Sequence, residues 1–99
     1  LLKYGGVTIY PKDIETVVRK WNGVTDVIVL KDSDAMYGDI PLLIIEGQIS
    51  LEEAHRRMAQ EIPQATAFKD IFIQSQFPRQ SLEKIDRKKL LDLARSLRQ

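Results

Sequence analysis

The sequence has no cysteine, a single histidine and only seven aromatic residues among its 99 positions. The lack of cysteine excludes disulfides and thiolate metal sites, and it fits a reducing cytoplasm. No apolar run approaches the roughly 20 residues that a membrane-spanning helix needs. The first residues show neither an initiator methionine nor the layout of a signal peptide, so we expect a fragment of a longer cytoplasmic protein.

Charge is nearly balanced overall but unevenly distributed. Residues 1–77 carry 8 basic and 11 acidic side chains, whereas residues 78–99 carry 7 basic and 3 acidic ones. No aromatic residue follows Phe77, so no stacking platform is interleaved with the basic residues, and we expect no nucleic acid partner. A nucleotide or pyrophosphate is the expected anion. The length suits one small domain with a single core.

Apolar spacing predicts the first helix and three strands. The helix begins at Pro11, which suits a first helical position, and ends at Asn22-Gly23. Its buried stripe is Ile14, Val17, Val18 and Trp21. We predict strands over Val24–Lys31, Ile40–Glu46 and Asp70–Gln76, with a polar loop over Asp32–Gly38.

Two further helices are predicted from their caps. Ser50 and Glu53 form a capping box, and Pro63 ends the helix that follows. Asp86 caps the last helix. The predicted apolar faces are Leu51, Ala54, Met58 and Ile62 in the first of these helices, and Leu90, Leu93, Ala94 and Leu97 in the second. The order predicts an α+β domain, with a small three-stranded mixed or antiparallel sheet, about three helices and a short N-terminal hairpin.

Lys84 stands on a short connector between the last predicted strand and the last predicted helix. A cation on a mobile connector between two rigid elements can be moved into a neighbouring site and withdrawn. A lone lysine has no specificity, but Pro78-Arg79 precedes this one and Ile85-Asp86-Arg87 follows it. The segment resembles the C-terminal signature of adenylate-forming enzymes, the family of acyl-CoA synthetases, peptide-synthetase adenylation domains and luciferases. Glu83 occupies the position of the family's glycine.

Two other segments are similar to motifs of the same family. Residues 1–15, from Leu1-Leu2-Lys3-Tyr4-Gly5-Gly6 to Ile14-Glu15, are similar to its hinge-proximal motif. Tyr37-Gly38-Asp39-Ile40-Pro41 is similar to its Trp/Tyr-Gly-Glu-x-Pro loop. In acyl-CoA synthetases the first motif approaches the pantetheine arm, which implies a supporting role for Lys3, Gly5 and Gly6. Their residue types alone favour a tight turn between two short strands.

The resemblance covers nearly the whole chain and implies a function. Residues 1–99 would be the C-terminal lid subdomain of an ATP-dependent, AMP-forming ligase of the acyl-CoA synthetase kind. The complete protein would activate a carboxylic acid with ATP and then form a thioester with CoA. Lys84 would be catalytic in the first step. The N-terminal adenylation domain, absent from this chain, would bind Mg²⁺ and hold the ATP and acyl pockets.

Two alternatives stay open from the sequence. One lies within the enzyme class, as the adenylation domain of a peptide synthetase or a luciferase-like oxidising enzyme, since this part of the family does not determine acyl specificity. The other is a non-enzymatic module whose basic last helix docks on an acidic partner or nucleic acid. No metal site is predicted, because Met36 and Leu43 occupy positions where a calcium loop starting at Asp32 needs oxygen ligands. We expect His55 to serve packing or to lie at the surface.

Overall fold

The fold is that of a computed structural model, which describes residues 1–36 and 38–98. Tyr37 and Gln99 lie outside the described residues. In chain order the elements are β1 (Leu2–Tyr4), β2 (Val7–Ile9), α1 (Pro11–Arg19), β3 (Val24–Asp34), β4 (Gly38–Gly47), α2 (Leu51–Glu61), a 3₁₀ turn (Ala65–Ala67), β5 (Asp70–Gln74) and α3 (Arg87–Arg98). The predicted α+β class is confirmed.

β4 lies at the centre of a mixed sheet. It pairs antiparallel with β3 along its whole length and parallel with β5, where Leu42 lies opposite Asp70. β1 joins the sheet through a single pair, Tyr4 with Gly38, and β2 pairs with β1 as the predicted hairpin. Within the described ranges the sheet therefore has five strands instead of the predicted three.

The predicted polar loop over Asp32–Gly38 is wrong for most of its length. Asp32 and Asp34 belong to β3, and they pair with Ile40 and Gly38 of β4. Asp32 accepts hydrogen bonds from arginines of α3 more than sixty residues away. The polar residues of this segment favour a loop. Asp32 is nevertheless stable inside β3, because the arginines of α3 pair with its carboxylate.

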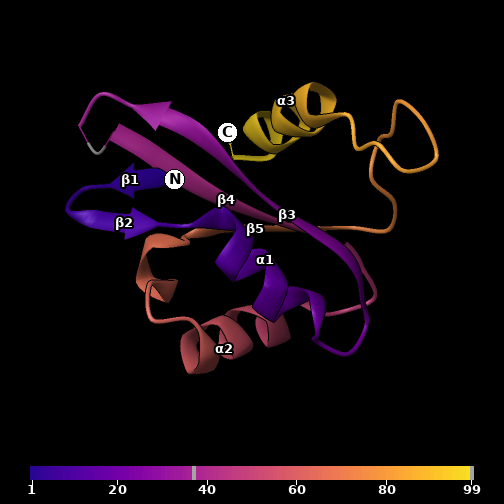
Figure 1. The fold of residues 1–99 in the computed structure, drawn as a ribbon, viewed down its shortest axis with the longest axis horizontal. Helices are drawn as coiled ribbons and strands as arrows, with labels where there is room; N and C mark the ends of the chain where they lie inside the picture. The colour runs from indigo at the N-terminus through magenta and orange to yellow at the C-terminus, as the bar shows by residue number, and fades with distance from the viewer. Residues whose placement is uncertain (37, 99) are drawn as a thin grey trace.

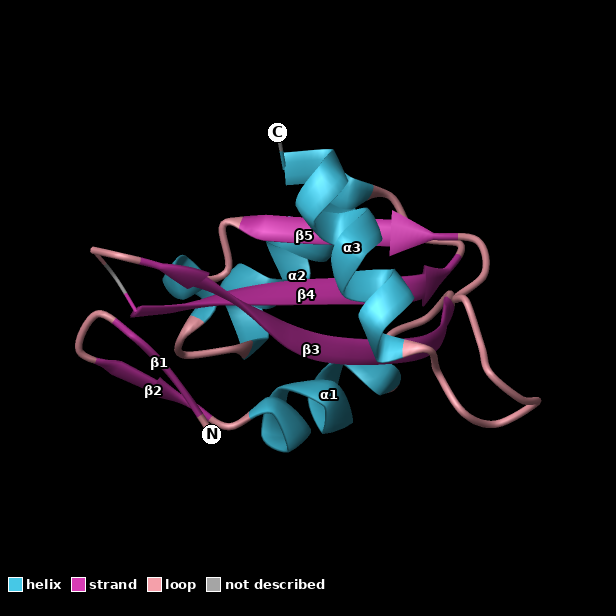
Figure 2. Cartoon of the chain, turned by 90° about the horizontal axis from the view of Figure 1, so that it is seen from above, coloured by secondary structure: helices cyan, strands magenta, loops and turns pink. Residues whose placement is uncertain are grey.

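The helices cover both faces of the sheet. Figures 1 and 2 show α1 and α2 on one face and α3 on the other. Leu43 and Ile45 of β4 pack in the cluster under α1 and α2, whereas Leu42 and Ile44 pack in the cluster under α3. Because successive strand residues point to opposite faces and both faces are covered, β4 is continuously apolar from Ile40 to Ile45. The sheet thus divides the single predicted core into two clusters.

The helix boundaries are close to those predicted, with local differences. Pro11 is the first residue of α1, but the helix ends at Arg19, so Trp21 lies beyond it and is nonetheless buried. Ser50 accepts the Glu53 N–H at 3.0 Å as predicted. The Glu53 carboxylate instead pairs with Arg57 at 2.7 Å, so only half of the capping box forms.

Three leucines predicted to be buried are exposed. Leu51 in α2 and Leu97 in α3 are each about half exposed, and Leu93 also lies at the surface. In α3 the buried residues are Leu90 and Ala94 alone. A 12-residue helix that lies on one face of a sheet buries only a narrow stripe of its side chains. The apolar face predicted from the sequence is wider than this stripe, so its outer residues are exposed.

Candidate functional site

Lys84 lies on an exposed loop that projects beyond one end of the sheet, at the right of Figure 1. An antiparallel bridge between Arg79 and Ile85 closes the base of this loop. The Gln80 N–H donates to the Lys84 carbonyl at 2.8 Å, and the Asp86 N–H donates to the Pro78 carbonyl at 2.8 Å. The Lys84 backbone is therefore held, while its side chain stays at the surface. Among the described residues no hydrogen bond or ion pair holds its ammonium group.

Both sides of the Lys84 loop are fixed to the domain. Asp86 caps α3, accepting the Lys89 N–H on Oδ1 at 3.1 Å. The helix thus begins three residues after Lys84, and the predicted cap is confirmed. On the other side, Phe77 is buried in the cluster that contains Leu90. Residues 80–84 project from a base that is anchored on both sides.

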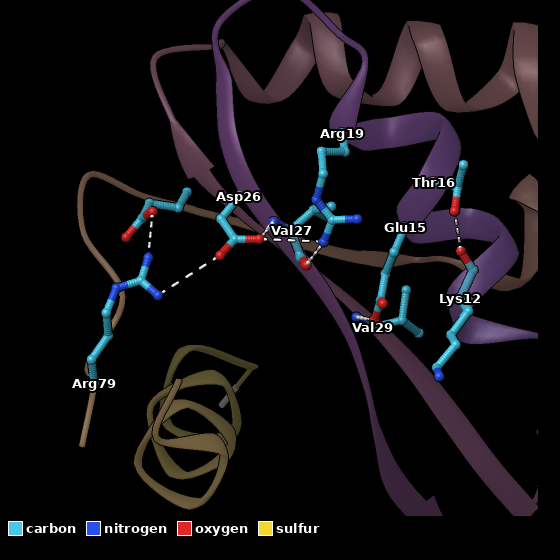
Figure 3. A network of polar contacts seen from close by, with 9 residues as sticks. Lys12, Glu15, Thr16, Arg19, Asp26, Val27, Val29 and Arg79 are labelled. Atoms are coloured by element: carbon cyan, nitrogen blue, oxygen red, sulfur yellow. Dashed lines mark hydrogen bonds and ion pairs between the residues drawn. The ribbon is translucent and has the colours of Figure 1, made fainter. Parts of the chain in front are cut away.

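A buried carboxylate meets the base of the loop. Glu46, at the end of β4, is the one buried charged residue in the described part of the chain. Its Oε2 accepts the Phe77 N–H at 2.6 Å, and its Oε1 accepts Arg79 Nη2 at 2.7 Å. Arg79 Nη1 also lies 3.7 Å from Asp26 Oδ2, and Figure 3 draws this ion pair as a dashed line. The Arg79 guanidinium lies 5.8 Å from the centre of the Phe77 ring.

Glu46 was not predicted from the sequence to be a site residue. The available signal was a glutamate that ends an otherwise apolar strand, where a buried charge needs a partner. That signal does not name the partner. Arg79 is 33 positions away, and only the parallel pairing of β4 with β5 brings the segment after β5 to the end of β4.

The second candidate loop is the turn between β1 and β2. Gly5 has a φ of +58°, and Tyr4 pairs with Val7 directly across the turn. This is the tight turn that the residue types predict, since a two-residue hairpin favours glycine at a positive φ. In the described hairpin, open space surrounds Gly5 and Gly6 on the side where a Cβ would stand, so a ligand could approach the backbone closely.

Residues of the third motif hold this hairpin. The Lys3 N–H donates to Asp39 Oδ2 at 3.1 Å. Gly38 has a φ of +84°, and a Cβ there would stand 3.4 Å from the Lys3 carbonyl oxygen. The described residues of the third motif therefore hold the β1–β2 hairpin, which belongs to the first motif, in place. Tyr37, its first residue, lies outside the described residues.

The structure keeps the two loops apart. The β1–β2 turn lies at one end of the sheet and the Lys84 loop at the other, in both views (Figures 1 and 2). Asp39 holds the first loop and Glu46 the second, and these residues are seven positions apart, which corresponds to about 23 Å along a strand. Lys84 and the Lys3–Gly6 turn therefore cannot contact one reacting centre together.

Known proteins are similar to this chain in sequence and in fold, although no protein-family model matches it. A 2-succinylbenzoate–CoA ligase from Listeria monocytogenes is 34% identical in an alignment of 92 positions that covers 91% of this chain and 20% of that protein. The o-succinylbenzoate CoA synthetase from Bacillus subtilis, solved with a product analogue, is 26% identical with a TM-score of 0.70 over 93% of this chain and 20% of that one. ATP-bound MatB from Rhodopseudomonas palustris has a TM-score of 0.81 at 17% identity, over 100% of this chain and 20% of that one.

This chain belongs to the adenylate-forming superfamily. It corresponds to the C-terminal subdomain of the acyl-CoA synthetase-like members, as the sequence resemblance indicates. The chain spans about a fifth of the length of the curated relatives it matches. The relatives bear on the family and the fold, whereas the roles of Lys84, Lys3, Gly5 and Gly6 remain predictions.

Glu83 replaces the glycine of the superfamily signature without backbone strain. No described non-glycine residue has a positive φ, so the loop does not need glycine at this position. The loop is therefore shaped to accept a side chain before Lys84. Glu83 is exposed and lines an open groove together with Lys84 and Arg87.

The described residues offer cations for a phosphate group and no metal centre. Lys84, Arg87 and Lys88 line the open groove beside the loop, where they could contact phosphate oxygens. No group of three or more histidine, aspartate or glutamate side chains in residues 1–36 and 38–98 could hold a metal ion. Within the same ranges, no helix has the length and apolar character needed to cross a membrane.

Proposed function

We propose that this chain is the lid subdomain of an ATP-dependent, AMP-forming acid–thiol ligase whose larger N-terminal domain holds the substrates. The complete protein would join a carboxylic acid to ATP, releasing pyrophosphate, and would then transfer the acyl group from AMP to the thiol of CoA. The observation that carries the proposal is Lys84, an exposed lysine on a loop with an anchored base, in register with the superfamily signature.

Lys84 supplies the charge that the first step requires. When a carboxylate oxygen attacks the α-phosphorus of ATP, negative charge grows on the phosphate oxygens and on the departing pyrophosphate. An ammonium at the tip of a four-carbon stem can lie between the carboxylate and the phosphate and stabilise both. Because the Lys84 side chain makes no internal pairing among the described residues, no contact within the domain has to break before it enters the site.

The β1–β2 turn serves the second step. Lys3, Gly5 and Gly6 would lie along the pantetheine arm of CoA, where a turn without side chains lets the backbone approach the thiol. Because this turn and Lys84 lie at opposite ends of the sheet, one orientation of the subdomain cannot serve both steps. The subdomain would therefore reorient on the N-terminal domain between adenylation and thioester formation.

The substrates and ions belong mainly to the N-terminal domain. ATP and CoA would bind there and contact this chain through Lys84 and through the turn. No group of three or more acidic or histidine side chains in the described part of this chain could hold a metal ion. Mg²⁺, which would neutralise phosphate charge, would be bound by the N-terminal domain. The named CoA ligases among the relatives make 2-succinylbenzoate the first acid to test. We place the complete protein in the cytoplasm.

The test is ATP–pyrophosphate exchange by the complete protein over a panel of carboxylic acids that includes 2-succinylbenzoate and fatty acids. The proposal predicts exchange that depends on one class of acid, followed by thioester formation with CoA. Transfer to a carrier protein and not to CoA would favour the peptide-synthetase alternative. Absence of exchange with every acid, together with salt-dependent binding of RNA or DNA, would overturn the proposal in favour of a binding module.

A further inference from the structure

We infer that Glu46 is a positioning residue for Lys84 in the adenylation step. The inference rests on the function proposed above and names a residue that the superfamily signature does not contain. Glu46 lies at the end of β4 and has no sequence proximity to Lys84. Its link to Lys84 runs through Phe77 and Arg79, which form one side of the base of the Lys84 loop.

The Glu46 carboxylate lies in a buried position, where a charge loses favourable hydration free energy. Its side chain is 6% exposed, and it lies on the sheet face that carries α3, next to the apolar Ile44 cluster. A buried carboxylate is tolerated when its oxygens are paired and hydrogen-bonded. Both Glu46 oxygens are used, one by the Phe77 N–H and one by the Arg79 guanidinium. The buried carboxylate thus fixes two groups just before the loop.

A neighbouring carboxylate reinforces the arrangement. Asp26 lies directly opposite Glu46 in the β3–β4 register, so two like charges share one face of the sheet. Like charges directly opposite each other destabilise a sheet. Arg79 pairs with both of them, at 2.7 Å from Glu46 and 3.7 Å from Asp26. The two carboxylates therefore fix the position of the Arg79 guanidinium, and this restrains the backbone of Arg79.

The position of Arg79 determines the position of Lys84. Arg79 forms the bridge with Ile85, the residue that follows Lys84. Gln80, the residue after Arg79, donates its N–H to the Lys84 carbonyl. A shift of the Arg79 backbone is therefore passed to Lys84 through one bridge and one hydrogen bond. Misplacement of a catalytic group by about 1 Å can cost roughly 100-fold in rate.

The deciding experiment compares half-reactions of the complete protein carrying Glu46→Gln. ATP–pyrophosphate exchange measures adenylation, and transfer from a preformed acyl-adenylate to CoA measures the second step. We expect kcat for adenylation to fall by about 10- to 100-fold. We expect transfer to stay within about twofold, because the β1–β2 turn lies at the other end of the sheet. A merely structural role would lower both rates together, in proportion to the folded fraction.

Asp32→Asn is the matched control. Asp32 is also a largely buried carboxylate paired with arginine, but its partners lie on α3 and it faces the opposite end of β4. Its loss should lower stability without changing adenylation per folded molecule. Should Glu46→Gln fail to fold, Arg79→Gln removes the other half of the pair at a side chain that is 24% exposed, and the same comparison is read from it.

A double substitution tests whether Glu46 acts through Lys84. On a Lys84→Ala background, Glu46→Gln should cause no further loss of adenylation, because the group that it positions is gone. Additive losses would overturn the inference, as would equal losses in both half-reactions. If Lys84→Ala lowers adenylation and Glu46→Gln does not, this inference fails and the proposed function stands. If Lys84→Ala leaves adenylation unchanged, both fail.

Discussion

Asp39 and Glu46 lie at the two ends of β4, and each carboxylate holds a different loop. Asp39 accepts the Lys3 N–H of the N-terminal hairpin, and Glu46 accepts the Phe77 N–H at the base of the Lys84 loop. The central strand of the sheet thus fixes the distance between the two candidate functional loops. Contacts at one end can be changed without touching the other, which makes the two half-reactions separately testable.

The hairpin is tested by Asp39→Ala. The substitution removes the acceptor of the Lys3 N–H, and a hydrogen bond of this kind contributes about 1 kcal/mol to stability. We expect a small loss of unfolding free energy and a slower transfer from preformed acyl-adenylate to CoA, with adenylation little changed. Asp92→Ala, at an exposed position of α3, is the control and should alter neither rate. A loss confined to adenylation would contradict the assignment of the hairpin.

Two apolar residues near the Lys84 loop should differ sharply in their contribution to stability. Phe77 is 3% exposed, whereas Leu82, at the tip of the loop, is 95% exposed. We expect Phe77→Ala to lower the unfolding free energy by about 3–5 kcal/mol, as core truncations of phenylalanine do. Leu82→Ala should change it by less than about 0.5 kcal/mol. Urea denaturation of the 99-residue chain measures both, and similar values would contradict the described loop.

The Asp32 cluster predicts a pH dependence of stability. Partial burial acts to raise the pKa of Asp32, but the Ser33 N–H and the paired Arg95 and Arg98 outweigh it and hold this pKa below its ordinary value. A lowered folded-state pKa stabilises the fold above the unfolded value of about 3.9. That contribution is lost as the pH falls through the folded-state pKa.

Asp32→Asn should therefore be less stable than the unchanged chain at pH 7, by about 1–2 kcal/mol. The difference should shrink as the pH falls below about 4. Denaturation midpoints measured between pH 7 and pH 2 check this, and a difference that stays constant over that range would contradict a lowered pKa of Asp32 in the folded state. Glu52→Gln, on an exposed part of α2, provides a carboxylate control.

Glu83 provides a test of the loop backbone. Because Glu83 does not adopt a positive φ, restoring the superfamily's glycine relieves no strain. Glycine instead adds conformational freedom to the unfolded chain, so Glu83→Gly should lower the unfolding free energy by about 0.5–1 kcal/mol. Glu83→Ala is the matched control and should be closer to neutral. A more stable glycine variant would show that the loop backbone is strained at this position.

Local signals in the sequence predicted the caps and the central strands. Pro11, Ser50 and Asp86 each act within one helical turn, and all three lie where their residue types indicate. The end of β3 was wrongly predicted as a loop, because Asp32 is stabilised in that strand by partners on α3. A prediction from neighbouring residues cannot include ion-pair partners that lie more than sixty positions away in the sequence.

The residues of the candidate site likewise include some that were predicted from the sequence and one that was not. Lys84 and the Gly5-Gly6 turn were found through a resemblance that spans nearly the whole chain. Glu46 was missed, because its importance comes from a meeting with Arg79 that the sheet topology creates. No local pattern predicts that the two loops lie apart, since strand order, rather than residue type, places them at opposite ends of β4.

The most direct test of the account measures both half-reactions of the complete protein carrying Lys84→Ala. Lys84→Arg serves as a control that retains charge while changing the shape of the donor. We predict that ATP–pyrophosphate exchange falls by about 10²–10³-fold in the alanine variant, the usual effect of removing one positioned charge-stabilising donor. Transfer from preformed acyl-adenylate to CoA should remain near the level of the unchanged protein. An equal loss in both half-reactions, or no loss of exchange, would contradict the assignment of Lys84 to adenylation.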